Sequence, residues 1–465
     1  MDHFFDTICA PATSVGAGAV SLIRISGPDT MVVVDRVVRF RHGEAASAKG
    51  YSLKFGSIDG LDEVLVALFR APHSYTGEDA AEISCHASHF IVTELLERLT
   101  DAGCRLAEAG EFTQRAFLNG KMDLAQAEAV ADVIASTTSA QHRVAMNQLR
   151  GGYSAELRGL RKQLLELTAL MELELDFSEE DVEFADRSRL RALLDTACSH
   201  CRQLADSFRL GNAIRNGVPV AIVGAPNSGK STLLNALLRD DRAIVSDIPG
   251  TTRDTVEETC VIDGVLFRFI DTAGIRESPD EIERLGIERT FRKISEAEIV
   301  LGVVDVTDAP ESIVDALRTM ADKIDFRHQK LLILANKTDK EPCNNNVNFV
   351  NSFVISPDYN KFTISVLEIS AQEGSGLENL RSALVSYAGI ASASGTLVTN
   401  ARHAAALREA ATSLSTVSDG LDRHLPSDLL AEDLRAALAS LGSITGEITT
   451  DEVLGEIFSR FCIGK

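Results

Sequence analysis

The residues with the clearest chemical meaning form a short glycine-rich segment, Gly224-Ala-Pro-Asn-Ser-Gly-Lys-Ser231. The apolar residues 220–223 before it predict a strand, and residues 232–238 after it predict a helix. In that context the glycines let the backbone wrap around phosphate groups, which the N–H groups at the helix start attract. Lys230 can reach the β- and γ-phosphates, and the Ser231 hydroxyl can bind Mg²⁺. The segment therefore predicts a nucleoside-triphosphate site.

Three further motifs follow in order, each after a predicted strand: Asp271-Thr-Ala-Gly274, Asn336-Lys-Thr-Asp339 and Ser370-Ala-Gln372. The first Asp can hold Mg²⁺ through water, and the Gly274 N–H can sense the γ-phosphate. In domains with this order of motifs, Asp339 accepts hydrogen bonds from guanine, Asn336 braces the loop, and residues 370–372 form the last base contact. Each motif is weak alone, but four in order predict GTP rather than ATP.

The group that orients the attacking water is not obvious from these motifs. Ile275 follows Gly274, where Ras-like proteins carry a Gln, and a branched alkane cannot hydrogen-bond water. The acids Glu277, Glu281 and Glu283 come next, and one of them could act through a bridging water. The residues alone do not choose between these acids, and a solvated acidic loop is the alternative.

A second question is which group neutralises the negative charge on the phosphates during hydrolysis, because no arginine finger can be identified. Asn227 in the phosphate loop, together with residues 246–252, offers another route. An amide oxygen and loop carbonyls could hold a monovalent cation beside the β–γ bridge. The alternative is that Asn227 is only a turn residue.

The elements that would position these motifs follow three patterns. Residues 1–120 mix short strand-like runs with helical stretches, which predicts a small α+β domain. Residues 121–215 and 384–465 have apolar residues at helical spacing, with a break at 176–181. Residues 216–383 alternate apolar strands with helices, which predicts a parallel, doubly wound sheet. The patterns predict an all-α domain split in sequence by an inserted α/β Ras-like P-loop domain, with residues 341–362 as a surface loop.

Composition limits the partners and the location. The net charge of −22 does not attract a polyanion, so a nucleic-acid substrate would need a local basic patch or a partner protein. No run of 18 apolar residues and no secretory signal is evident, so we expect a cytoplasmic protein without a membrane partner. The single Cys198-Ser-His-Cys201 motif is expected to be structural rather than a metal or redox site.

Further segments are more distinctive than the nucleotide motifs. They are Ala17-Gly-Ala-Val-Ser-Leu-Ile-Arg-Ile-Ser-Gly27, Tyr75-Thr-Gly-Glu-Asp79, Gly110-Glu-Phe-Thr-Gln-Arg-Ala-Phe-Leu-Asn119, Lys121-Met-Asp-Leu-Ala-Gln-Ala-Glu128, Gly250-Thr-Thr-Arg-Asp254 and the terminal Phe461-Cys-Ile-Gly-Lys465. With the nucleotide motifs, they resemble the tRNA-modification GTPase family MnmE, also called TrmE, over essentially the whole chain.

The resemblance implies four segments: 1–120 as a dimerising, folate-binding α+β domain, 121–215 and 384–465 as the two parts of the helical domain, and 216–383 as the inserted G domain. It implies a homodimer that acts with an FAD-containing, MnmG-like protein, as a heterotetramer that provides most of the tRNA binding. Together they would add an aminomethyl-type group to the wobble uridine of certain tRNAs. The one-carbon unit would come from a tetrahydrofolate derivative, in its 5-formyl or methylene form, and K⁺ would stimulate GTP hydrolysis.

The resemblance also assigns residues, position by position. The folate site would use Arg24, Glu82, Lys121 and Lys465. Mg²⁺ would be held by Ser231 and Thr252, and K⁺ by Asn227, Ser246, Ile248 and Thr251. Glu283 would orient the attacking water through another water, and Cys462 could take part in the modification chemistry or merely pack. The GTP contacts would be Asn227, Ser228, Gly229, Lys230, Ser231, Thr232, Ser246, Asp247, Ile248, Pro249, Gly250, Thr251, Thr252, Asp271, Thr272, Ala273, Gly274, Asn336, Lys337, Asp339, Ser370, Ala371 and Gln372.

Two other functions fit a chain with these nucleotide motifs. One is a regulatory GTPase of ribosome assembly, similar to Era, but no RNA-binding module is evident and the pI near 4.9 argues against direct rRNA binding. The other is a folate-dependent enzyme with a vestigial G domain, which the complete set of motifs disfavours.

Overall fold

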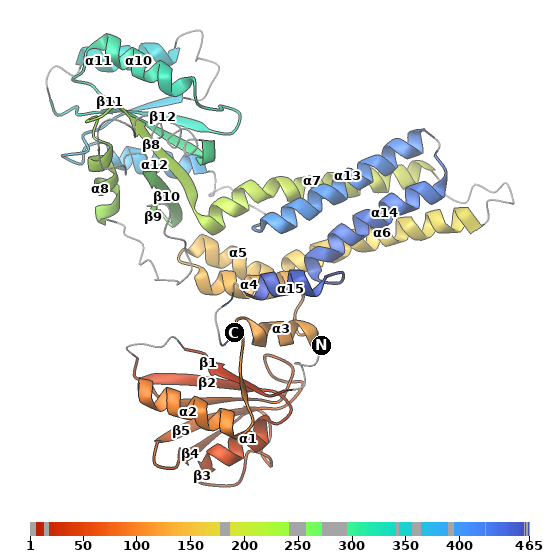
Figure 1. Ribbon diagram of the computed structural model, residues 1–465. Coiled ribbons are helices and arrows are strands. Elements are labelled where there is room, and N and C mark those ends of the chain that lie inside the picture. The colour runs from red at the N-terminus through yellow and green to blue at the C-terminus, as the bar shows by residue number, and fades with distance from the viewer. Residues whose placement is uncertain are drawn as a thin grey trace, which may run out of the picture. The chain divides into compact units, whose positions relative to one another are not determined.

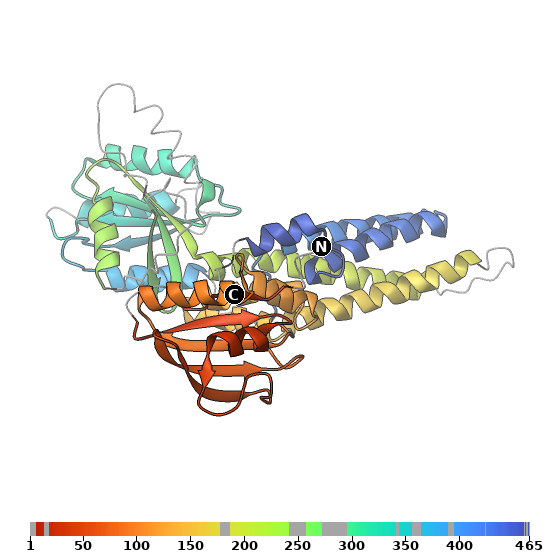
Figure 2. The same cartoon turned by 60° about the horizontal axis from the view of Figure 1, so that its bottom comes forward.

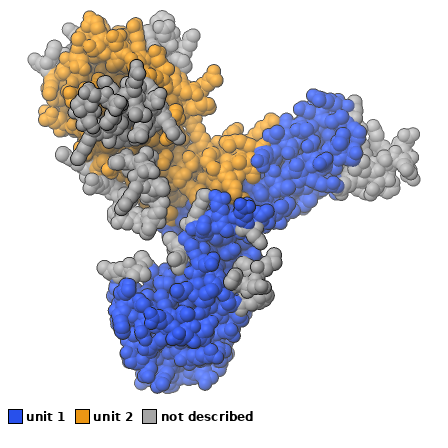
Figure 3. Space-filling model, viewed as in Figure 1, with its two compact units in different colours: residues 1–134, 146–199, 409–465 blue, residues 135–145, 200–408 orange. Residues whose placement is uncertain are grey.

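The computed structural model describes residues 6–13, 18–176, 187–240, 257–271, 295–340, 344–355, 364–388, 395–423, 425–459, 461 and 464. The chain forms two compact units, coloured separately in Figure 3. Unit 1 holds Met1–Ile134, Met146–Ser199 and Glu409–Lys465, and unit 2 holds Ala135–Ala145 and His200–Arg408. The division falls inside three continuous helices, α5 (Ser139–Leu149), α7 (Arg187–Asn216) and α13 (Ala401–Asp422). The domain boundaries proposed at 120, 215 and 383 therefore remain predictions.

Unit 1 begins with a seven-stranded sheet in the order β3-β4-β5-β6-β2-β1-β7. Its strands are β1 (Ile8–Pro11), β2 (Val20–Ser26), β3 (Arg39–Phe40), β4 (Ser52–Ile58), β5 (Asp62–Phe69), β6 (Ala80–His86) and β7 (Arg105–Leu106). All neighbours are antiparallel except β1 and β7. Helices α1 (Thr30–Val37) and α2 (His89–Asp101) contact each other and β6, and Figure 1 shows them beside the sheet.

Buried and exposed side chains alternate along these strands, and the buried ones show which face of the sheet the helices cover. In β2, Ile23 and Ile25 are buried, whereas Arg24 between them is partly exposed. The buried set of this face joins the residues of α1 and α2 in one core, which includes Val34 and Leu95. The opposite face carries exposed apolar side chains on β4 and β5. This half-covered antiparallel sheet is the α+β domain that the sequence predicts.

The rest of unit 1 is helical. Helices α3 (Glu111–Leu118) and α4 (Leu124–Ala135) lead to α6 (Gly152–Asp176), which packs against α14 (Ser427–Thr445); Figures 1 and 2 both show these two helices side by side. Arg161 and Glu447 form an ion pair of 2.8 Å. Cys198, in α7, donates through Sγ to the Ala411 carbonyl of α13. The last described helix is α15 (Asp451–Phe458). The helix break predicted at 176–181 lies, except for residue 176, outside the described residues.

Unit 2 contains a six-stranded sheet in the order β13-β12-β11-β8-β10-β9. Its strands are β8 (Val218–Gly224), β9 (Glu257–Ile262), β10 (Val265–Asp271), β11 (Ile299–Asp305), β12 (Lys330–Asn336) and β13 (Ile364–Glu368). Every neighbouring pair is parallel except β9 and β10. Unit 2 also includes helix α5 in part (Ser139–Leu149). The sheet confirms the doubly wound α/β domain predicted from alternating apolar strands and helices.

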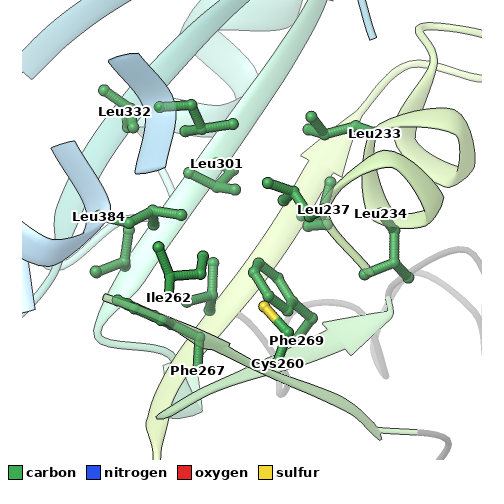
Figure 4. Close-up of a cluster of buried hydrophobic side chains, with 14 of the residues drawn as sticks. Leu233, Leu234, Leu237, Cys260, Ile262, Phe267, Phe269, Leu301, Leu332 and Leu384 are labelled. Carbon is green, nitrogen blue, oxygen red and sulfur yellow. The ribbon is translucent and has the colours of Figure 1, made fainter. Parts of the chain in front are cut away.

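Helices cover both faces of this sheet, so its central strands β8, β11 and β12 are apolar except at their ends. One face packs against α8 (Lys230–Asp240) and α12 (Leu377–Ala388); Figure 4 shows Leu233 and Leu237 of α8 with Phe269 and Leu301 of the sheet in this core. The other face packs against α10 (Pro310–Ala321) and α11 (Asn344–Ile355). Every residue of β11 is buried as a result.

One expectation was wrong. Residues 341–362 were predicted to form a surface loop, but α11 occupies much of that stretch. Val350 and Phe353 are buried in the core beside α10. The polar Asn-Asn-Asn start of the segment hid an amphipathic helix whose apolar positions are 347, 350 and 353. Among the described residues, no helix is both long enough and apolar enough to cross a bilayer.

Candidate functional site

The phosphate loop connects β8 to α8 at the carboxyl edge of the parallel sheet. Strand β8 ends at Gly224 and α8 begins at Lys230. Ser231 and Thr232 are exposed in the first turn of α8, where the backbone N–H groups of a helix have no partner within it. Lys230 donates through Nζ to the carbonyls of Gly224, at 2.9 Å, and Ala225, at 2.8 Å. The loop therefore combines a helix N-terminus and a lysine charge, as a phosphate group requires.

Two glycines of this loop are required by its geometry. A Cβ at Gly229 would lie 2.2 Å from Nδ2 of Asn336, and the residue has a φ of +100°. A Cβ at Gly224 would lie 2.4 Å from the Val303 carbonyl oxygen. Asn227 is also left-handed, with a φ of +60°, a conformation that asparagine tolerates better than most residues. This conformation suits a turn residue and leaves the Asn227 side chain exposed.

Asn336 joins three of the four predicted motifs. Its side chain is buried at the end of β12. Nδ2 donates to the Ser228 carbonyl at 2.8 Å, and Oδ1 accepts from the Ala371 N–H at 3.0 Å. One amide therefore fixes the phosphate loop, residues 336–339 and residues 370–372 relative to one another. Asp339 is exposed beside it, Ser370 and Ala371 are buried, and Gln372 is exposed.

Lys337 is held by a residue that the sequence did not single out. Its φ of +69° is unfavourable for a non-glycine residue. Its ammonium pairs with the buried carboxylate of Asp305, which ends β11 and lies opposite Asn336 in the register of the sheet. Asp305 also accepts from the N–H and hydroxyl of Thr307, at 2.9 and 2.7 Å. Burial alone would raise the pKa of Asp305, but the hydrogen bonds and the Lys337 charge lower it below its usual value.

Other predicted nucleotide residues lie outside the described part of the chain. They are Ser246, Asp247, Ile248, Pro249, Gly250, Thr251, Thr252, Thr272, Ala273, Gly274 and Glu283. The backbone of Asp271 ends β10 and pairs with Ile222 in β8, so this motif begins at the same edge of the sheet as the phosphate loop. Within the described residues, no group of three or more His, Cys, Asp or Glu side chains could hold a metal ion.

A second cluster lies on the N-terminal sheet. Arg24 and Glu82 are opposite each other on β2 and β6, and their side chains pair at 2.9 Å. The Arg24 guanidinium lies 5.4 Å from the centre of the Tyr75 ring and 5.7 Å from that of Phe112. It also donates to the Gly464 carbonyl at 3.3 Å. The structure thus brings two predicted folate residues together, with two aromatic rings that sequence reasoning did not select.

The remaining folate residues divide between described and undescribed parts. Lys121 is exposed and donates through Nζ to the Pro72 carbonyl at 2.9 Å. Lys465 and Cys462 lie outside the described residues, although Gly464 between them is placed. Gly464 has a φ of +93°, and a Cβ there would lie 2.1 Å from the Pro11 carbonyl oxygen. Burial raises the pKa of the Tyr75 hydroxyl, which bonds to Thr113 at 2.9 Å, so Tyr75 stays neutral at physiological pH.

A buried ion network supports this second cluster. Arg115, in α3, is almost fully buried and pairs with Asp6 at 2.6 Å, Glu78 at 3.3 Å and Glu111 at 3.4 Å. Glu78 also accepts from the Ser26 hydroxyl at 2.7 Å. The network fixes residues 75–79 against α3. Two of the distinctive sequence segments are therefore in direct contact.

Matches to known proteins cover nearly the whole chain. The model described as "GTP-binding protein TrmE N-terminus" matches residues 7–121, and the model described as "MnmE helical domain" matches residues 124–462. The chain is similar to a protein of Bacteroides thetaiotaomicron named "tRNA modification GTPase MnmE", with 50% identity and 99% of each chain covered. A protein of the same name from Porphyromonas gingivalis is 50% identical and is matched over 98% of its length by 99% of this chain.

A solved structure shares part of the chain. It is Era in complex with MgGDPNP and nucleotides of 16S ribosomal RNA, at 28% identity, with 42% of this chain and 66% of that chain covered and a TM-score of 0.30. At that TM-score the likeness carries no weight for fold or function.

Proposed function

The chain belongs to the MnmE family of tRNA modification GTPases, and we propose that it uses GTP hydrolysis to drive modification of the wobble uridine of certain tRNAs. The observation that carries this proposal is the connection made by Asn336. One buried amide holds the phosphate loop and both base-recognition motifs in a single arrangement. Lys230 and Ser231 would hold the phosphates and Mg²⁺, with Thr252 as the second Mg²⁺ ligand. Asp339 would select guanine.

We propose K⁺ as the ion that neutralises charge during hydrolysis. The chain has Ile275 where a Gln would orient water, so the catalytic group must come from elsewhere. The exposed Asn227 would contribute its side-chain oxygen to K⁺, with Ser246, Ile248 and Thr251 as further ligands. Glu283 would orient the water. The Asn227 side chain is exposed and makes no hydrogen bond within the described residues, which leaves its oxygen available.

Hydrolysis by the full chain should depend on the monovalent cation. A charge placed like an arginine finger is worth about 10³- to 10⁵-fold in rate, so turnover in K⁺ should exceed turnover in Na⁺ by more than about tenfold. Glu283→Ala should abolish turnover and leave GTP affinity nearly unchanged, whereas Glu277→Ala serves as the matched control. Equal rates in the two cations would exclude the K⁺ site, and full turnover by Glu283→Ala would assign the role to another acid.

We propose that a reduced folate binds beside Arg24 and Glu82, with Lys121 and Lys465 completing the site. A carboxylate can pair with the amino and N–H groups of a pterin, and cationic groups can meet the glutamate tail. The exposed ring of Tyr75 next to Arg24 fits a flat heterocycle, whereas the ring of Phe112 is fully buried and contacts only the Arg24 guanidinium from within the domain. When bound, the folate would supply the one-carbon unit. The role of Cys462 stays open between chemistry and packing.

The folate site is tested by titration of the full chain with 5-formyltetrahydrofolate, followed by calorimetry. Loss of a charge-assisted hydrogen bond costs about 1.5–3 kcal/mol, so Arg24→Ala should weaken binding by about 10- to 100-fold. Arg98→Ala, which removes an arginine ion pair elsewhere in the same domain, should leave binding unchanged. No binding by the unaltered protein would remove the folate from the proposed function.

A homodimer is proposed from the uncovered face of the N-terminal sheet. Leu53, Ala67, Glu82 and Arg24 follow one another in direct register across β4, β5, β6 and β2. Residues in such a row project from the same face, so the exposed Leu53 shares a face with the proposed folate site. Phe55 and Leu65, also exposed, form the neighbouring row. A second copy on this face would bury the apolar rows and enclose the folate.

The remaining partners are proposed from the family. An FAD-containing, MnmG-like protein would supply the redox chemistry and most of the tRNA binding, in the cytoplasm. The alternative of a ribosome-assembly GTPase has no observation in its favour. It would leave the residues matched by the N-terminal and helical models without a role.

A further inference from the structure

One segment of this acidic chain is strongly basic. Residues 36–54 contain three arginines, two lysines and His42, against the single acid Glu44. The whole chain, by contrast, has 68 acidic and 46 basic residues. The segment runs from the end of α1 through β3 into β4, so it forms one margin of the N-terminal sheet. A local excess of this kind is where a polyanion would bind to an acidic protein.

Four side chains of this segment are exposed and unpaired, and we name Arg39, Arg41, His42 and Lys49 the edge patch. Among the described residues, no hydrogen bond, ion pair or ring contact involves these four side chains. Other arginines of the same domain behave differently. Each of five has a carboxylate partner: Arg24, Arg70, Arg98, Arg105 and Arg115. The edge patch is thus a group of cations that the fold leaves available.

The fold also holds these cations in place. Arg39 lies in β3, and Arg41 follows directly after its last residue. The register places Arg39 opposite Ser57, and the Arg41 N–H donates to the Phe55 carbonyl. Lys54 donates through Nζ to the carbonyls of His42 and Glu44, at 3.2 and 3.0 Å, and so anchors the loop after β3. The backbone under the patch is therefore ordered before any ligand arrives.

Nearby acids offset the patch only in part. The exposed Glu44 is the one acid inside the segment, and it leaves five Arg and Lys charges against one carboxylate. Both carboxylate oxygens of Asp35 accept from the N–H groups of Ala45 and Ala46, at 2.6 and 2.9 Å. On the face of Arg39, the next acid in register is Glu63, which lies two strands away, or about 9–10 Å. Salt screens charges beyond about 8 Å at physiological ionic strength, so the distant acids of the chain have little effect on a ligand at the patch.

Cations on an edge strand have another common role. Strand β3 is at the end of the sheet order, and charged side chains there prevent unwanted pairing with other strands. That role needs a charge of either sign on the strand itself. It does not account for Lys49, which lies in the turn before β4 and not on the edge strand. Protection of the edge strand needs only a charge, whereas binding of a polyanion needs a positive charge. Reversing the sign of the charge therefore distinguishes the two roles.

We propose that the edge patch binds the phosphate backbone of the tRNA substrate. The inference rests on the proposed function, which supplies the polyanion, and it adds a site on this chain for it. Arginine and lysine contacts to phosphate position a nucleic acid without reading its sequence. The patch lies at the margin of the sheet face proposed for the homodimer, so each copy would present one patch at the rim of that interface.

The test compares two triple variants of the full chain. Arg39→Gln/Arg41→Gln/Lys49→Gln removes the cations of the edge patch, and Arg318→Gln/Arg327→Gln/Arg423→Gln removes three exposed arginines elsewhere. Binding of fluorescent tRNA is measured by anisotropy at several KCl concentrations. Each lost phosphate contact lowers the slope of log K against log salt by about 0.9, so the patch variant should lose about 2–3 units of slope. Its affinity at low salt should fall by at least about tenfold, while the control should match the unaltered chain.

GTP turnover checks that both triple variants are folded, and a further variant tests the sign of the charge. GTP turnover should be equal in both variants, because neither set of residues touches the nucleotide. Arg39→Glu/Arg41→Glu keeps a charged edge and should bind tRNA even more weakly than the glutamine variant. Normal tRNA binding by Arg39→Glu/Arg41→Glu would show that the cations only protect the edge, and would overturn the proposal.

Other outcomes are equally decisive. An unchanged affinity and salt slope in the patch variant, or no tRNA binding by the unaltered chain, would overturn the proposal. The proposal would also be overturned if the patch variant still bound tRNA but no longer bound poly-glutamate. That result would assign the patch to an acidic protein. The proposed function fails separately, if the unaltered chain does not restore tRNA modification in a strain lacking its own copy. If it does restore modification while the patch variant binds tRNA normally, only the patch proposal fails.

Discussion

At the scale of single residues, the least expected feature is Asp305. Nothing in the four nucleotide motifs names it, yet its carboxylate holds Lys337 and Thr307 beside the motif proposed to contact guanine. It is an acid that ends an otherwise apolar strand, and Asp271 likewise is the last residue of β10. An acid at the end of a predicted apolar strand is the sequence pattern from which Asp305 could have been identified. We infer that Asp305 is a positioning residue, which acts on the nucleotide through the left-handed Lys337.

Removal of this carboxylate should weaken GTP binding. Asp305→Ala leaves Lys337 without its partner, and a lost charge-assisted hydrogen bond corresponds to about 10- to 100-fold in affinity. The turnover number should change much less than KM, because Asp305 does not touch the reacting atoms. Asp305→Asn keeps acceptors for Lys337 and Thr307 and should recover part of the affinity. Asp308→Ala, an exposed acid in the next turn, is the control, and equal affinities in the two alanine variants would contradict the assignment.

At the scale of elements, the buried network around Arg115 connects helix α3 to segments far away in the sequence. Its partners Glu78 and Asp6 lie 37 and 109 residues from it. The network holds residues 75–79, and therefore the Tyr75 ring beside Arg24, against α3. The conspicuous motifs at 75–79 and 110–119 are explained by this contact, so several of their charged residues serve the structure rather than the chemistry.

Breaking that network should destabilise the N-terminal domain. Among the described residues, Arg115→Met leaves Glu78 without a cationic partner and leaves Asp6 and Glu111 with Arg105 alone. Breaking a buried ion pair from one side typically costs about 3–5 kcal/mol. Hydrogen exchange should show faster exchange in residues 70–79 and in α3. Arg98→Met, which removes a half-exposed pair with Glu94, should cost less than about 1 kcal/mol. Exchange in residues 70–79 that is no faster in Arg115→Met than in Arg98→Met would show that the network does not hold the loop.

The sequence predicts elements well where a motif fixes their place. The strand before each nucleotide motif and the helix after the phosphate loop follow from local pattern, so the doubly wound domain could be predicted. Helix α11 could not, because its polar start hides three apolar positions that only the core of unit 2 reveals. The pairing of Arg24 with Glu82 depends on strand register, which the sequence alone leaves open. Long-range contacts such as Arg115–Asp6 are beyond any local pattern.

At the scale of the whole molecule, one chain combines a GTPase domain with an N-terminal domain that has its own polar cluster. The family models match both parts of unit 1, and α7 and α13 contribute to both units. The −22 net charge makes binding of tRNA by the chain as a whole unfavourable. We therefore propose that the edge patch and a partner contact the tRNA and that unit 2 hydrolyses GTP.

The central claim, that GTP use by this chain serves tRNA modification, is tested most directly by mass spectrometry of tRNA nucleosides. The tRNA comes from a strain that lacks its own family member and expresses this chain or its Lys230→Ala variant at equal levels. The account predicts that the unaltered chain restores the aminomethyl-type wobble modification and that Lys230→Ala does not. Failure of the unaltered chain, or equal restoration by both, would contradict it.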